Sequence, residues 1–126
     1  MALYWTIDSR RRSVELMADG DVSMADAMAF FDAVEGANAL SYSKLLDGTR
    51  ARVAMTPDDV LSIVVRIRAL HALGTMGALA VVATAEQAQR IARLLGAAAV
   101  ADRPMKLFDD VKQARRWLEA QPSRLP

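Results

Sequence analysis

The sequence predicts an α/β domain with a mixed, mostly parallel five-stranded sheet, in the order β-β-α-β-α-β-α-β-α, and with helices largely on one face. Two short alternating stretches, residues 2–8 and 13–18, open the chain and predict an antiparallel hairpin. Helical periodicity and short apolar runs then alternate, which is typical of parallel strands joined by crossover helices. One such run, residues 78–83 (ALAVVA), is apolar throughout, as expected of a central parallel strand.

Length and composition limit the class of protein. The 126 residues predict a single domain, 1–126, long enough to bury its own core, and 53% hydrophobic with 25% charged residues excludes a disordered chain. The chain has no cysteine, which excludes disulfides, thiolate metal sites and a cysteine nucleophile. Neither a signal peptide pattern nor a run of about 18 apolar residues occurs. We therefore expect a cytoplasmic protein with no transmembrane segment.

The charge balance bears on partners. A net charge of +1 argues against a dedicated nucleic-acid binder. The charge is unevenly divided, however, because residues 1–63 sum to −4 and residues 64–126 to +5. Such a chain can associate with itself or with an acidic partner, although solvated surface charge is the commoner explanation.

The link between the first two strands is basic. It contains Arg10, Arg11 and Arg12, which could bind phosphate or an acidic partner, although charges at a hairpin tip commonly serve solubility. Residues 19–21 (DGD) are expected to end the second strand. Ser23 then begins a helix that Gly36 ends. Its predicted core face consists of Met24, Ala27, Met28, Phe31 and Val34.

The stretch 43–60 carries the main functional hypothesis. Strand 43–46 is expected to stop at Asp47, and a polar loop with Arg50 and Arg52 follows. In open α/β sheets, loops that leave the carboxyl ends of strands usually hold the functional site. The candidate ligand- or partner-binding residues are Asp47, Arg50, Arg52, Thr56, Asp58 and Asp59.

The helix that follows has a strong start signal. Thr56 is a capping hydroxyl, Pro57 occupies the first helical position, and two aspartates face the positive end of the helix dipole. Helix 57–73 is predicted to pack along a line through Val60, Val64 and Ile67, and to end at Gly74. His71, the only histidine, lies on this line and is expected to be partly buried or to cap the helix.

The last third of the chain contains two further helices. Thr84 is expected to cap helix 85–95, which Gly96 would end, and Asp109 to cap helix 110–120 after strand 105–108. The final helix would direct Val111, Ala114 and Leu118 inward, with Trp117 as a cover over the core. The tail, residues 121–126, is expected to be frayed.

Motifs for catalysis and cofactor binding are absent from the sequence. It has no Gly-x-Gly-x-x-Gly after a strand, no phosphate-binding Gly-Lys-Ser/Thr loop and no Gly-x-Ser-x-Gly elbow. Asp58 and Asp59 are adjacent and point in different directions, so they form a poor acid–base pair. We expect no catalytic residue, no metal and no cofactor.

These features resemble the SpoIIAA-like branch of the STAS superfamily, the small proteins related to anti-sigma-factor antagonists. The resemblance covers about residues 2–120 and is a pattern of positions. It implies a sheet of successive βα units and a binding or regulatory domain, not an enzyme. The residues that carry it are 14–18 with Gly20-Asp21-Val22-Ser23, 42–47 (YSKLLD), Thr56-Pro57-Asp58-Asp59-Val60, ALAVVA, and Leu107-Phe108-Asp109 through Ala114, Trp117 and Leu118.

The resemblance also implies a place for a phosphorylation switch. In the antagonists, a serine in an Asp-Ser-Ser-Gly-like motif at the start of the second helix is phosphorylated by a partner kinase. Thr56 is the nearest hydroxyl at that place here. The glycine is missing, proline follows, and two acids would repel an added phosphate. Thr56 is therefore expected to be a plain cap, with a phosphoacceptor as the alternative.

Three hypotheses about function remain open at this point. The first is a non-catalytic STAS-like domain that binds a protein partner, a lipid or a small ligand. The second is a small enzyme or accessory subunit that acts on an anionic substrate at the 47–59 loop. The third is a homodimer, because ALAVVA would leave an apolar patch if helices covered only one side of the sheet.

Overall fold

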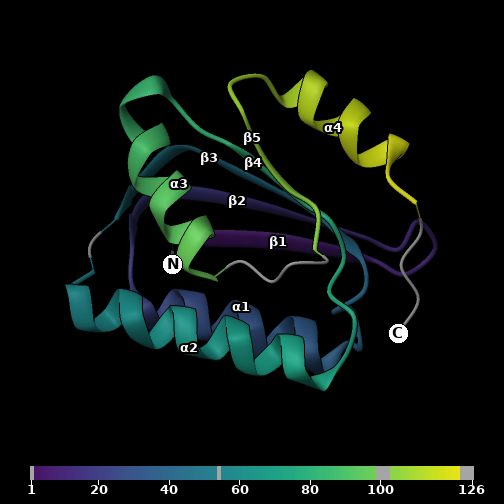
Figure 1. Ribbon diagram of the computed structural model, residues 1–126, viewed down its shortest axis with the longest axis horizontal. Helices are drawn as coiled ribbons and strands as arrows, with labels where there is room; N and C mark the ends of the chain where they lie inside the picture. The colour runs from purple at the N-terminus through teal and green to yellow at the C-terminus, as the bar shows by residue number, and fades with distance from the viewer. Residues whose placement is uncertain (1, 54, 99–102, 123–126) are drawn as a thin grey trace.

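The strands form one mixed sheet in chain order, β1-β2-β3-β4-β5 (Figure 1). The computed structural model describes residues 2–53, 55–98 and 103–122. β1 pairs with β2 in antiparallel fashion and all other pairs are parallel, which confirms the predicted sheet and element order. The elements are β1 (Leu3–Asp8), β2 (Ser13–Val22), α1 (Met24–Gly36), β3 (Ser43–Val53), α2 (Pro57–Leu73), β4 (Leu79–Val82), α3 (Ala85–Ala98), β5 (Met105–Phe108) and α4 (Val111–Ala120).

The helices divide unequally between the two faces of the sheet. The parallel strands β2 to β5 always add on the same side, and right-handed crossovers then place α1, α2 and α3 on one face. Here α1 and α2 lie side by side below the sheet, whereas α4 lies on its other face (Figure 1). Three of the four helices therefore share a face, which confirms the prediction of helices largely on one face.

Two hydrophobic clusters match these two faces. On the α1 side, Phe30 and Val34 pack with Val14 of β2, and the Trp5 and Phe30 rings meet edge to face at 5.5 Å. On the α4 side, Ala114 packs with Leu45, Ala80 and Val82, and the Trp117 ring lies 5.8 Å from that of Phe108.

The predicted central strand is buried on both faces. Ala80, Val81 and Val82 are each at most 1% exposed, since successive side chains of β4 point to opposite faces and helices cover both. The apolar patch that suggested a homodimer is thus absent, because α4 covers it.

Two predicted strand ends are wrong. β2 continues to Val22, so residues 19–21 lie within the strand, and β3 continues to Val53, so the expected polar loop after Asp47 is also strand. Asp19 pairs with Arg50 and Asp21 with Arg52 across the two strands. A register shift between Met17 and Asp19, with Gly20 at φ +86°, accommodates the irregularity. Taken alone, the sequence of these polar residues is typical of a loop. They form strands because each pairs with a residue of the neighbouring strand.

Two helix boundaries also differ. α3 continues to Ala98 and contains Gly96, which was expected to end it. α4 begins one residue late, because Asp110 rather than Asp109 provides the cap and accepts a hydrogen bond from the Lys112 N–H at 3.0 Å. Of the predicted frayed tail, residues 123–126 lie outside the described residues.

Candidate functional site

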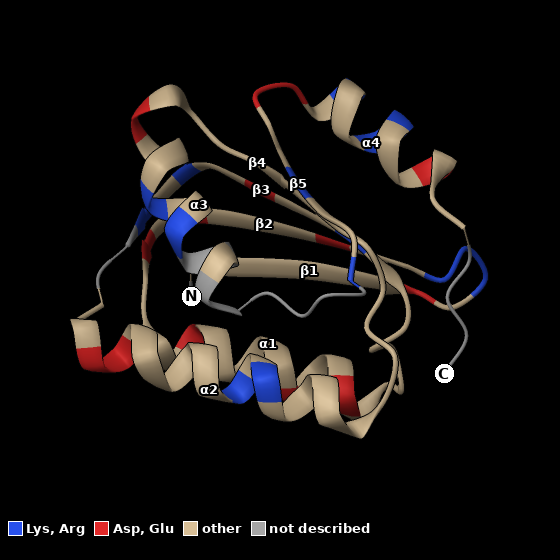
Figure 2. Cartoon of the chain, in the orientation of Figure 1, with Lys and Arg blue, Asp and Glu red and all other residues tan. Residues whose placement is uncertain are grey.

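The two arginines of the predicted site lie on β3 and make ion pairs with β2. The Arg50 Nε is 3.7 Å from the Asp19 carboxylate, and the Arg52 Nε is 2.9 Å from that of Asp21. Acidic and basic segments lie close together at the end of the sheet beside the start of α3 (Figure 2). All four side chains are largely exposed, so these pairs contribute little to stability. Each arginine is nevertheless neutralised by one aspartate, so this surface carries no excess of positive charge.

Asp47 is engaged with a neighbouring residue of its own strand. Its Oδ1 accepts hydrogen bonds from the backbone N–H of Thr49 at 3.1 Å and from the Thr49 hydroxyl at 2.8 Å. Just beyond it, the Gln87 side-chain amide donates to the Gly48 and Ala51 carbonyl oxygens at 2.9 and 3.1 Å. These contacts connect the middle of β3 to the first turn of α3.

Thr56 and Asp59 form a complete capping box at the start of α2. The Thr56 Oγ1 accepts a hydrogen bond from the Asp59 N–H at 3.1 Å, and the Asp59 carboxylate accepts one from the Thr56 N–H at 3.2 Å. The predicted cap is therefore confirmed. No hydrogen bond or ion pair between described residues joins this group to Asp47, Arg50 or Arg52. The six predicted residues thus form separate local clusters and not one site.

Replacing Thr56 with alanine is expected to lower the free energy of unfolding by about 1 kcal/mol, because an orphan N–H of the first turn loses its acceptor. Urea unfolding followed by circular dichroism measures this loss. Ser62→Ala, in the same helix, is the control and should change the free energy by less than about 0.5 kcal/mol. Equal losses in the two variants would contradict the capping role.

The outward surface of α2 is unexpectedly apolar. Leu61, Val65 and Leu73 are 61%, 59% and 65% exposed, whereas the buried residues of the helix are Ile63 and Leu70. The predicted core line through Val60, Val64 and Ile67 is only half-buried, and His71 is half-buried, as expected, in the last turn. Since α2 carries apolar residues around most of its circumference, its sequence could not show which side faces solvent.

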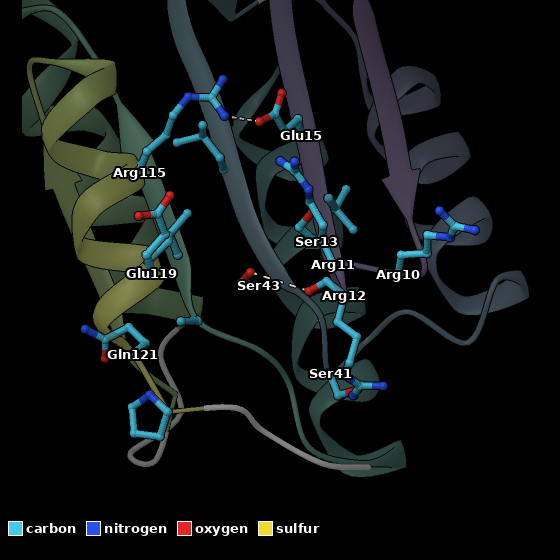
Figure 3. A pocket seen from close by; sticks show the side chains of 15 residues that line it. Arg10, Arg11, Arg12, Ser13, Glu15, Ser41, Ser43, Arg115, Glu119 and Gln121 are labelled. Carbon is cyan, nitrogen blue, oxygen red and sulfur yellow. Dashed lines mark hydrogen bonds and ion pairs between the residues drawn. The ribbon is translucent and has the colours of Figure 1, made fainter.

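The structure also contains a groove that the sequence did not predict. It lies at the end of the sheet where β3 and β4 begin, opposite to the end where β3 leads into α2. It has a volume of about 450 Å³, and its walls are the β1–β2 turn and α4 (Figure 3). The residues that line it are Arg10, Arg11, Arg12, Ser13, Val14, Glu15, Ser41, Ser43, Leu45, Ala78, Arg115, Leu118, Glu119, Gln121 and Pro122.

An ion pair crosses this groove. Arg115 of α4 binds the Glu15 carboxylate of β2, and this contact raises the pKa of the Arg115 guanidinium. A smaller hollow of about 300 Å³ continues beyond it toward Tyr4 and Met17, and both hollows are lined by Glu15, Leu45 and Arg115. The pair therefore divides one long depression between α4 and the sheet into two parts.

A buried lysine lies near the same edge of the sheet. Lys44 is 6% exposed, and its Nζ donates hydrogen bonds to the carbonyl oxygens of Leu40 and Tyr42 at 2.7 and 2.8 Å. Burial lowers the pKa of Lys44 to about 7, and the charge of Arg103 adds to the effect. The Arg103 Nε itself donates to the Gly77 carbonyl oxygen at 2.8 Å.

Two kinds of feature are missing from the described part of the chain. Within it, no cluster of three or more His, Asp or Glu side chains is arranged to hold a metal ion. Also within it, no helix is both long enough and apolar enough to cross a membrane.

Comparison with solved structures identifies the fold. No family model matches the sequence, and no curated protein matches it. An uncharacterized DUF3478-family protein with a SpoIIAA-like fold, from Shewanella loihica PV-4, is similar with a TM-score of 0.60 and 18% identity, over 93% of this chain and 94% of that one. An anti-sigma factor antagonist from Mycobacterium paratuberculosis is similar with a TM-score of 0.57 and 18% identity, over the same shares of the two chains.

A third structure agrees with these two. The anti-sigma factor antagonist SpoIIAA in its unphosphorylated form is similar with a TM-score of 0.58 and 12% identity, over 95% of this chain and 100% of that one. At these identities the likeness shows the fold alone. The chain has the SpoIIAA-like fold, as its sequence resemblance indicated.

Proposed function

We propose that this SpoIIAA-like fold serves as a non-catalytic regulatory domain that binds a protein partner through the outer surface of α2. We call the exposed side chains of Asp58, Leu61, Val65 and Leu73 the α2 face. The observation that carries the proposal is the exposure of three large apolar side chains, 59% to 65%, on one helix. Two of the three similar structures are of anti-sigma factor antagonists, which favours a regulatory role over an enzymatic one.

The spacing of these residues suits recognition by a groove on a partner. Leu61 and Val65 have the i, i+4 spacing of apolar anchors on a helix that inserts one face into an apolar groove. Single exposed apolar residues are ordinary, but several on one helix face mark an interaction surface. We propose Arg50 and Arg52 as polar contacts at the margin, since β3 leads directly into α2.

The polar residues near this surface support binding better than catalysis. Asp59 caps α2 through Thr56, while Asp19 and Asp21 neutralise the two arginines of β3. An enzyme needs a base or nucleophile that is held ready for a substrate. In the described structure these acids are instead engaged with their neighbours.

The test is a double substitution, Leu61→Ser with Val65→Ser. Tagged protein is incubated with extract of the source cells, and the amount of each co-purified protein is compared between variants. Tyr4→Ser with Met17→Ser is the matched control, because it removes exposed apolar side chains from the sheet instead of from α2. We expect a partner that the control variant retains and the α2 variant loses. Equal recovery by both variants would refute the proposal.

The apolar α2 face also favours a second candidate, a homodimer. Sedimentation of the purified protein at increasing concentration separates the two. Self-association that the α2 variant abolishes would assign this face to a second copy of the chain. A strict monomer would exclude the homodimer and leave a different protein as the partner.

A further inference from the structure

We propose that the groove between the β1–β2 turn and α4 binds a small organic anion with a phosphate or carboxylate head and an apolar body. The groove lies between the β1–β2 turn and α4, on the face of the sheet that α4 covers, whereas α2 packs on the opposite face (Figure 1). It is therefore separate from the α2 face. Its volume of about 450 Å³ is within the range of small-molecule sites, roughly 300 to 1,000 Å³.

Arginines from two distant segments meet at this groove. The turn contributes Arg10, Arg11 and Arg12, and α4 contributes Arg115 from the opposite wall (Figure 3). Arg11 extends from the turn along β2 toward Glu15, Arg12 reaches toward Ser41, and Arg10 points away from the groove (Figure 3). The other three arginines outnumber the two acids of the lining, Glu15 and Glu119, so the groove has a net charge of +1. Guanidinium groups match carboxylate and phosphate oxygens in pairs, so the head of the ligand is an anion.

One of these arginines, Arg12, is held in place by contacts of its side chain and has a strained backbone. Arg12 has φ +52°, in the left-handed region that favours glycine and costs other residues about 1 kcal/mol. Its Nη2 donates to the Ser41 hydroxyl at 2.8 Å, and its guanidinium lies 5.0 Å above the centre of the Tyr42 ring. Strain of this kind gathers at ligand sites, where it holds a group ready before the ligand arrives.

The rest of the lining indicates the body of the ligand. Half-buried Leu118 gives the groove an apolar wall beside the hydroxyls of Ser13 and Ser43, and Leu45 and Ala78, which are almost fully buried, lie next to it. An inorganic ion would leave this apolar surface and most of the volume unused. An aromatic or short aliphatic body attached to the anionic head would cover it.

The chain also contains a competitor for the ligand. The Glu15 carboxylate binds Arg115, with side chains 52% and 49% exposed respectively. A ligand anion must therefore share or replace Glu15 at that guanidinium. Because exposed pairs of this kind add little to folding stability, Glu15 can be neutralised without unfolding the protein.

The experiment is an NMR titration of the ¹⁵N-labelled protein with phenyl phosphate. Saturable shifts are expected at residues 10–13, at Ser43 and at Arg115. Arg11→Gln should weaken binding about tenfold, the effect of one charge-assisted hydrogen bond, whereas Glu15→Gln should tighten it severalfold. Arg90→Gln, which removes an exposed charge from α3, is the matched control and should leave binding unchanged. Unchanged amide spectra without ligand show that each variant is folded.

Three results would overturn the proposal. The first is the absence of saturable binding at millimolar phenyl phosphate. The second is an equal loss in Arg11→Gln and Arg90→Gln, which would indicate general attraction to a positive surface. The third is tighter binding of a glutamate-rich peptide at the same residues, which would assign the groove to a protein. A further comparison tests the apolar body alone: inorganic phosphate that binds as tightly as phenyl phosphate would refute the apolar body, whereas weaker binding of inorganic phosphate supports it.

Discussion

Replacement of Gly77 by alanine is expected to lower the free energy of unfolding by about 3 kcal/mol. A Cβ at this position would collide with the Tyr42 carbonyl group and lie 2.6 Å from the Ser41 carbonyl oxygen. These are backbone atoms and cannot rotate away. Gly77 cannot retreat easily either, since its N–H donates to the Leu40 carbonyl oxygen at 2.9 Å and its own carbonyl accepts from Arg103. Chemical unfolding at neutral pH measures the loss.

Gly74 provides the matched control for this substitution. It lies three residues earlier in the same connection, and its backbone is extended, with φ 170°. No described atom outside its immediate chain neighbours lies within 4 Å of the position that a Cβ would occupy there. Gly74→Ala should change the stability by no more than about 0.5 kcal/mol. Wild-type stability of Gly77→Ala would contradict the close contact between this connection and residues 41–42.

The protein is expected to become more stable as the pH rises from about 7 toward 10.5, because of Lys44. Burial lowers the pKa of Lys44 from 10.5 to about 7 in the folded state. Between these values the unfolded chain holds a proton on Lys44 that the folded protein lacks. Raising the pH therefore favours folding, by up to about 1.4 kcal/mol per pH unit. The contribution of deprotonated Lys44 to folding stability is complete above pH 10.5. It decreases as the pH falls below 10.5 and is lost once the pH has fallen through about 7.

Urea unfolding at several pH values in this window measures the slope. Lys44→Met should flatten it, because methionine keeps an unbranched side chain and has no proton to bind. Lys112→Met, at an exposed position of α4, should keep the wild-type slope. A slope in Lys44→Met equal to that of the wild type would show that Lys44 is not responsible.

The order of the elements and the helix starts could be predicted because their signals are local. Ser23, Thr56 and Thr84 each accept a hydrogen bond from the N–H three residues later, as their positions before periodic segments predicted. Strand ends are different, because they depend on a partner. In β3, exposed Arg50 and Arg52 alternate with half-buried Ala51. This segment forms a strand because β2 lies alongside it, with Asp19 and Asp21 opposite the two arginines.

The sites were harder to predict for the same reason. Arg11 and Arg115 are about a hundred residues apart, and only the paired sheet and the return of α4 over its free face bring them to one groove. Lys44 has no sequence feature that distinguishes it from an exposed lysine. Its burial follows from the connection through Leu40 and Tyr42, whose carbonyl oxygens accept its hydrogen bonds.

Photo-crosslinking from α2 tests the proposed docking surface most directly. A photoreactive phenylalanine analogue is placed at Val65 on the α2 face or, as the control, at the exposed Gln113 of α4. Both proteins are irradiated in extract of the source cells. We predict one discrete adduct from position 65 that position 113 does not give and that excess unlabelled protein suppresses. The same adducts from both positions, or none from position 65, would contradict a docking role for the α2 face.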